Sequence, residues 1–156
     1  MKILFLSALL FFASCAVAPP AKPAKAPFKT SLSRTDRMTL EEKFHYNAIA
    51  PDTTYGFSET NPVNCAYHRS GNDIMGAVTQ YYFLDHLVPA IGGEVEFTRK
   101  GSCCQYASSN DAPGKFVLLD IYEVRTPAKT YVLYLNLYDD GEVYPPRGFR
   151  FRKLTD

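Results

Sequence analysis

Two neighbouring segments in the second half of the chain show the alternation of apolar and polar side chains that is typical of β-strands. They cover residues 116–125 and 130–138. Only Thr126-Pro-Ala-Lys129 separates them, a length suited to the turn of a β-hairpin. Because the strands of a hairpin run antiparallel, this pair indicates an antiparallel sheet. Residues 94–99 also alternate, and a last extended segment, 149–151, buries Phe149 and Phe151 in our interpretation.

Two helices are predicted ahead of these strands. Thr39-Leu-Glu-Glu42 has the capping-box pattern, which indicates a short helix through about residue 46. Gly71-Asn-Asp73 offers a second N-cap, and apolar residues follow at helical spacing until Pro89, giving a main helix over 73–87. The expected fold class is α+β, with an antiparallel sheet of about four to five strands packed against this one main helix.

The strand pattern also predicts how the two faces of the sheet differ. One face of the last long strand carries Leu133 and Leu135 and is expected to pack against the helix. The other face is expected to be partly wet and to form a polar binding site. Its residues are Asp120, Tyr122, Asn136 and Tyr138.

The N-terminus has the parts of a secretory signal. A basic start is followed by the apolar run 3–12 and then by Ala13-Ser14 before Cys15. The run is far shorter than the roughly 20 residues that a membrane-spanning helix needs. Lipoprotein signals end in an aliphatic residue, two small residues and an acylated Cys; here Phe12 stands at the aliphatic position. We therefore predict a lipoprotein signal peptide over 1–14, lipidation of Cys15 and a location in the cell envelope. The absence of Asp directly after Cys15 favours the outer membrane.

Residues 15–36 are rich in Pro, Ala and Lys and are predicted to be a lipid-anchored tether, with a single domain over 37–156. Removal of 1–14 lowers the 17 Lys and Arg residues by one, which balances them against the 16 Asp and Glu residues. This balance gives no reason to expect a nucleic-acid partner. The expected partners are the membrane, through the lipid, and an envelope polymer or protein, for which the alternating basic and aromatic tail 147–153 is one candidate strip.

Three cysteines remain after lipidation: Cys65, Cys103 and Cys104. An exported domain meets an oxidising compartment, so at least one disulfide is expected. Adjacent Cα atoms lie about 3.8 Å apart, whereas ordinary disulfides need roughly 4.4 to 6.8 Å. Geometry therefore favours a bond from Cys65 to Cys103 or Cys104, with the remaining thiol either buried or reactive.

Five segments, in the same order, resemble a family of small uncharacterised bacterial lipoproteins: 55–62, 97–104, 118–124, 133–141 and 146–149. The most specific is the Arg-x-Gly-Ser-Cys-Cys run that ends at Cys104. The resemblance implies export and one compact domain. Some members carry the name 2-dehydro-3-deoxyphosphooctonate aldolase, but enzymes of that name are (β/α)₈ barrels of about 250 residues, twice this domain. Relatives usually have a Gly-rich loop without cysteine around 65–76, which gives a direct Cys103–Cys104 bond more weight.

Catalysis and metal binding are the alternatives to a plain binding module. Cys65 and His68 have the spacing of half a zinc site, which Cys103 and Cys104 could complete. A cofactor-free thiol enzyme would use Cys103 or Cys104 with one of three bases: His45, His68 or His86. We expect no metal and no cofactor, interpret residues 139–142 as a turn, and favour a non-enzymatic binding or structural module over the thiol enzyme.

Overall fold

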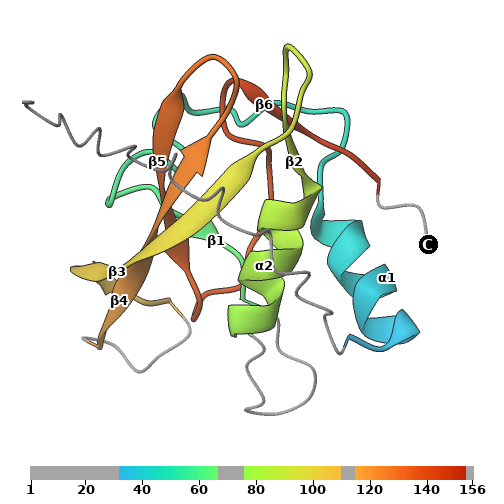
Figure 1. The fold of residues 1–156 in the computed structure, drawn as a ribbon. Helices are drawn as coiled ribbons and strands as arrows, with labels where there is room; N and C mark the ends of the chain where they lie inside the picture. The colour runs from blue at the N-terminus through green and yellow to red at the C-terminus, as the bar shows by residue number, and fades with distance from the viewer. Residues whose placement is uncertain (1–31, 67–75, 110–114, 154–156) are drawn as a thin grey trace, which may run out of the picture.

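The computed structural model describes residues 32–66, 76–109 and 115–153, which form an α+β fold (Figure 1). In these residues a four-stranded mixed sheet and a two-stranded antiparallel sheet accompany two helices. The elements in chain order are α1 (Arg34–Lys43), β1 (Val63–Asn64), α2 (Gly76–His86), β2 (Leu87–Pro89), β3 (Glu96–Ala107), β4 (Phe116–Arg125), β5 (Thr130–Asn136) and β6 (Phe149–Phe151).

The predicted hairpin is confirmed, and it forms the centre of the larger sheet. β4 and β5 pair antiparallel from Arg125 opposite Thr130 to Asp120 opposite Leu135. The strand order is β1-β5-β4-β3. The sheet is mixed and not wholly antiparallel, because β1 adds to β5 in parallel, with Val63 opposite Leu135. β6 is also confirmed as a strand, but it pairs with β2 outside this sheet.

β3 is twice the length of the predicted strand 94–99, because it continues through the Gly101 to Cys104 run. Two register shifts interrupt its pairing with β4, one between Arg99 and Gly101 and one between Cys103 and Gln105. Each shift leaves one extra residue on β3, which is a β-bulge. Gly101 (φ 142°) and Cys104 (φ 56°) take up the left-handed backbone that these bulges need.

α1 begins five residues before the predicted start at Thr39. Ser33 is the N-cap: its hydroxyl accepts a hydrogen bond from the Asp36 amide, and the Asp36 carboxylate accepts one from the Ser33 amide. This reciprocal capping box satisfies the first amides of the helix, so Thr39 lies inside it. The expected boundary between tether and domain, after residue 36, falls within this helix. The helix ends at Lys43 because Phe44 is extended and bridges to Val143.

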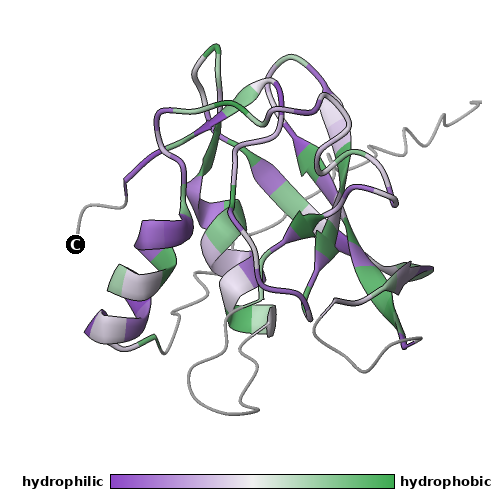
Figure 2. Cartoon of the chain, turned by 180° about the vertical axis from the view of Figure 1, so that it is seen from behind, coloured by the Kyte–Doolittle hydropathy of each residue, from purple (hydrophilic) through white to green (hydrophobic). Residues whose placement is uncertain are grey.

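α2 confirms the centre of the predicted main helix, while its predicted N-cap at 71–73 lies outside the described residues. The helix packs on the face of the sheet that carries Tyr122 and Leu133, and α1 lies alongside it (Figure 1). Green apolar segments alternate with purple polar ones along the strands seen from behind (Figure 2). The buried core includes Phe44, Val63, Tyr82, Phe83, Leu84, Leu87, Tyr122, Val124, Leu133, Leu135, Phe149 and Phe151.

Candidate functional site

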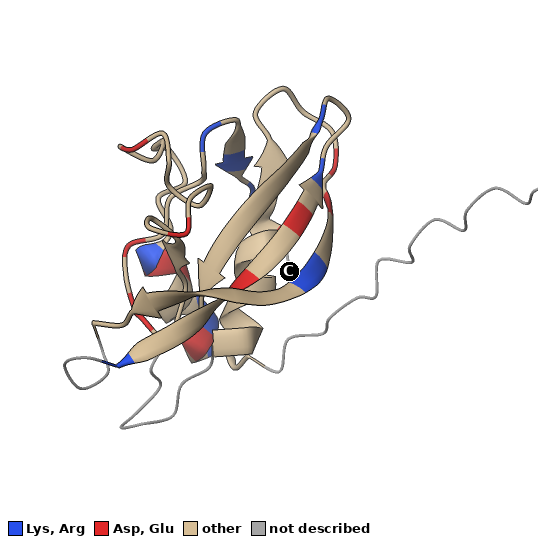
Figure 3. Cartoon of the chain, turned by 90° about the vertical axis from the view of Figure 1, so that its left-hand side faces the viewer, with Lys and Arg blue, Asp and Glu red and all other residues tan. Residues whose placement is uncertain are grey.

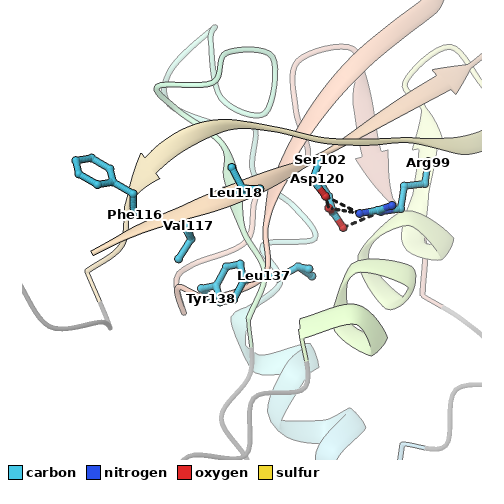
Figure 4. A pocket seen from close by; sticks show the side chains of 8 residues that line it. All are labelled: Arg99, Ser102, Phe116, Val117, Leu118, Asp120, Leu137 and Tyr138. Carbon is cyan, nitrogen blue, oxygen red and sulfur yellow. Dashed lines mark hydrogen bonds and ion pairs between the residues drawn. The ribbon is translucent and has the colours of Figure 1, made fainter. Parts of the chain in front are cut away.

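A hollow of about 450 Å³ opens on the sheet beside the first turn of α2 (Figure 4). We call it the Arg99 hollow. β3 and β4 supply most of its wall, and the chain after β5 closes it. Its lining residues are Arg99, Ser102, Phe116, Val117, Leu118, Asp120, Leu137 and Tyr138.

Three polar side chains at one end of the hollow hold one another in place. The Arg99 Nε donates to Asp120 Oδ2 at 3.0 Å, and its Nη2 donates to Asp120 Oδ1 at 2.7 Å. The Ser102 hydroxyl donates to Asp120 Oδ1 at 2.7 Å and accepts from Arg99 Nη2 at 2.6 Å. The side chain of Asp120 is 7% exposed and that of Arg99 is 45% exposed. The carboxylate thus fixes an arginine whose outer edge stays accessible.

The same contacts determine the ionisation of this cluster. Burial alone would raise the pKa of Asp120, but hydrogen bonds from Arg99 and Ser102 and the nearby guanidinium charge hold it below its usual value. The hydrogen bond to Asp120 raises the pKa of Arg99. Asp120 is therefore a carboxylate at neutral pH and a weak base, so it does not activate the Ser102 hydroxyl as a nucleophile.

Arg99 keeps hydrogen-bonding capacity for a ligand. Its Nε and Nη2 are used by Asp120 and Ser102, and within residues 32–66, 76–109 and 115–153 its Nη1 has no hydrogen-bond partner. Basic and acidic segments are interspersed over this side of the protein, shown as blue and red in Figure 3. Since Asp120 already neutralises Arg99, the free Nη1 donors suit a neutral acceptor such as a carbonyl or hydroxyl oxygen.

Apolar side chains form the opposite end of the hollow. Phe116 and Leu118 lie four and two residues before Asp120 on β4; both are exposed, whereas Asp120 is buried and points toward Arg99 (Figure 4). Phe116 is 62% exposed, Leu118 51% and Tyr138 37%. Exposed apolar side chains that gather beside a fixed polar group are typical of binding surfaces.

The prediction that Asp120, Tyr122, Asn136 and Tyr138 share one polar face of the sheet was wrong. Four residues connect Arg125 to Thr130, so each facing pair joins an odd-numbered residue to an even-numbered one. Asp120 and Tyr122 consequently share a face with odd-numbered Leu135 and Leu133, and not with Asn136 and Tyr138. Asp120, Tyr122 and Asn136 are also buried and not partly wet.

The four residues of that prediction have separate positions. Asp120 and Tyr138 both line the Arg99 hollow. The hydroxyl of Tyr122 lies under α2 and donates to Gln80 Oε1 at 3.0 Å. Asn136 is the last residue of β5, and its Nδ2 donates to Asn64 and Asp139.

Sequence reasoning did not single out Arg99, Ser102, Phe116 or Leu118 as site residues. Two signals pointed toward them. Arg99 and Ser102 belong to the Arg-x-Gly-Ser-Cys-Cys run, and Phe116 and Leu118 are large apolar residues with the same parity as Asp120. What the sequence lacked was the register of β3 against β4, which two bulges displace.

The favoured pairing of Cys65 was wrong. Cys103 and Cys104 form a disulfide with each other, across a Cα–Cα distance of 3.7 Å. The left-handed backbone of Cys104 brings the two sulfurs to one side, which an ordinary strand does not allow. Among the cysteines that the structure describes, Cys65 is the free thiol; it is buried beside β5, where its Sγ donates to the carbonyl of Asn136. Burial raises the pKa of Cys65, so this thiol is inert.

The histidines that the structure describes make contacts with residues other than Cys103 and Cys104. His45 pairs with Glu142 and stacks on Tyr144. His86 is buried, and its Nδ1 donates to the carbonyl of Tyr82; burial lowers the pKa of its ring. In the described parts of the chain no group of three or more His, Cys, Asp or Glu residues could hold a metal ion. His68 of the predicted zinc half-site lies outside them, as does Cys15.

Comparison of the chain with protein-family models, with curated proteins and with solved structures gave no match. The resemblance to the lipoprotein family therefore stays a prediction from the sequence. In the ranges that the structure covers, no helix has the length and apolar character that crossing a membrane requires.

Proposed function

We propose that this protein is an exported, lipid-anchored lipoprotein of the cell envelope, whose folded domain is a non-catalytic binding module. The proposed location in the cell envelope rests on the signal-peptide pattern and on Cys15. The observation that carries the binding role is the Arg99 hollow, in which accessible apolar side chains adjoin an arginine fixed by a buried carboxylate. The cysteines support binding over thiol catalysis, because one is buried and the other two are bonded to each other.

The chemistry of the hollow favours one class of ligand. Arg99 Nη1 offers donors, while Asp120 supplies the counter-charge, so a neutral acceptor binds without leaving an unpaired charge. An anion such as phosphate would instead face the Asp120 carboxylate. Phe116 and Tyr138 provide aromatic surface for apolar faces of the same ligand. A polymer rich in amide carbonyls, hydroxyls and methyl groups meets all these demands, and peptidoglycan is the envelope polymer of that composition.

Cosedimentation of the purified protein with isolated peptidoglycan sacculi tests this proposal. Leu118→Ala removes apolar surface that is 51% exposed, and Arg99→Lys keeps the charge while removing the planar donors of Nη1. We expect each change to weaken binding about tenfold, the loss of roughly 1.4 kcal/mol.

Val132→Ala is the matched control, since Val132 is an apolar residue of similar exposure (46%) outside the hollow. It should bind sacculi like the wild type. Thermal melting of each variant establishes that the fold is kept. Absence of sacculus binding by the wild type, or equal binding by all three variants, would overturn the proposed function of the hollow.

A further inference from the structure

We propose that the Cys103–Cys104 disulfide is a reversible redox site that a dithiol reductant opens, and that its oxidation state controls the geometry of the Arg99 hollow. The redox site stands on contacts around β3 and needs neither the lipid anchor nor a ligand. Its failure and the failure of sacculus binding are therefore separate results.

The disulfide is placed where a reductant can reach it. Cys103 and Cys104 are each half-buried, in contrast to Cys65, which is buried. β3 is the last strand of the four-stranded sheet, with β4 on one side and no strand partner on the other among the residues that the structure describes. Thiol–disulfide exchange needs such access, because the incoming thiolate attacks one sulfur directly.

The exchange is a two-electron step. A thiolate of the dithiol attacks one sulfur of the pair, breaks the Cys103–Cys104 bond and forms a mixed disulfide. The second thiol of the reductant then displaces the bound cysteine and leaves the reductant as a disulfide. Two electrons and two protons pass to Cys103 and Cys104, which become free thiols. Oxidation by a disulfide reverses each step, and no large motion is required since the two sulfurs belong to adjacent residues.

The oxidation state is coupled to the backbone through Cys104. It is the non-glycine residue with positive φ (56°) in the described parts of the chain. It is also the extra residue of a bulge, because Cys103 lies opposite Leu119 and Gln105 opposite Leu118. A side chain disfavours the left-handed region, and the disulfide holds Cys104 there. Reduction removes this constraint, and Cys104 then favours the extended region.

A backbone change at Cys104 affects the hollow through the β3 residues before it and through those after it. Ser102 lies two residues before it, opposite Asp120, and completes the cluster with Arg99. Gln105 follows it, opposite Leu118. Loss of one bulge shifts the strand by one residue, which turns the side chains on the shifted part to the opposite face. The reduced protein consequently loses the fixed alignment of Arg99, Ser102 and Asp120.

Reduction of the purified full-length protein with dithiothreitol under native conditions tests the redox site. Alkylation and peptide mass spectrometry should show labelling of Cys103 and Cys104 in the native protein, and labelling of Cys65 only after unfolding. In NMR spectra the Arg99 Nε–H signal should move on reduction, and amide exchange at Gln105 and Tyr106 should become about tenfold faster. Reoxidation should restore both readouts.

Two variants identify the source of these changes. Cys65→Ala keeps the disulfide and should respond to reduction like the wild type. The double variant Cys103→Ser/Cys104→Ser should show the reduced pattern in both redox conditions. Where the double variant does not fold, the reversible cycle of the wild type decides. A pair that resists dithiothreitol in the native state, or a reduced protein with unchanged Arg99 and Gln105 signals, would refute the proposal.

Discussion

At the scale of single residues, the buried carboxylates of Asp120 and Asp139 are stabilised because several donors surround each of them. The Asp139 carboxylate accepts from the Ser108 hydroxyl, the Ser109 amide and Asn136 Nδ2. The Asp120 carboxylate accepts from Arg99 and Ser102. A buried charge without such partners would cost several kcal/mol. These contacts explain how the site can contain a buried carboxylate.

The stability that Asp120 contributes should depend on pH with a definite sign. Its pKa in the folded protein lies below the ordinary value of about 3.9. The contribution is therefore complete above that ordinary value and is lost as the pH falls through the lower folded pKa. Asp120→Asn should lower the free energy of unfolding by about 1–3 kcal/mol near pH 6, and by less near pH 3. Urea denaturation at the two pH values measures the difference.

Ser102→Ala provides the comparison for this titration. It removes one hydrogen bond to Asp120 but leaves the Arg99 pair, so most of the pH dependence should remain. A gap between wild type and Asp120→Asn that stays constant from about pH 6 to pH 3 would contradict the assigned pKa direction.

At the scale of elements, local sequence patterns predicted α2 and the β4–β5 hairpin. The pairing of strands that are distant in the sequence could not be predicted from such patterns. Helical periodicity and a short turn are properties of neighbouring residues. The parallel addition of β1 to β5 joins Val63 to Leu135, and no local pattern specifies that contact. The faces of the hairpin were misassigned because residue parity across the four-residue turn decides them. The hollow depends on both bulges of β3, and only Gly101 among their residues is a usual signal for one.

The position of α2 over the sheet should depend on the absence of a side chain at Gly76. A Cβ added there would lie 2.5 Å from the carbonyl oxygen of Leu137, a lining residue of the hollow. Alanine raises helix propensity by up to about 1 kcal/mol, but a backbone clash of this kind costs about 1–3 kcal/mol. Gly76→Ala should therefore destabilise the protein by up to about 2 kcal/mol in urea denaturation.

Ala77→Gly, at the next and exposed position of α2, isolates helix propensity from packing. It should cost about 0.5–1 kcal/mol without altering the Arg99 hollow. A Gly76→Ala protein that is more stable than the wild type would show that Leu137 moves aside freely.

At the scale of the whole molecule, the described residues form one α+β fold, and the N-terminal residues carry the pattern from which we propose export. The fold combines a helix-covered sheet with a second small sheet, β2–β6, which completes the core through Phe149 and Phe151; the Phe151 ring packs on Phe44, the residue after α1. Among the residues that the structure describes, β1–β5 is the one parallel pair of named strands, an arrangement that differs from the repeated strand–helix units of an aldolase barrel.

The proposed signal-peptide cleavage and lipidation predict a defined N-terminus for the mature protein. Expression of the chain in a diderm bacterium should yield a protein that lacks residues 1–14 and carries acyl chains on Cys15, because two or more chains are needed for stable anchoring. Intact-mass spectrometry measures both changes at once. Cys15→Ala should abolish the acyl mass and the processing in front of residue 15. A mature protein that begins elsewhere and bears no lipid would contradict the prediction.

The bulges of β3 have a consequence for copies of this protein that meet one another. Under the proposed membrane anchoring, copies would be confined to a surface and would meet far more often than in a dilute solution. An unbroken 12-residue edge strand would then serve as a template on which a second copy could add, and sheets would grow from molecule to molecule. The bulges at Gly101 and Cys104 divide that edge into short, misaligned pieces. The same irregularities that shape the hollow thus disfavour the addition of a second copy at this edge.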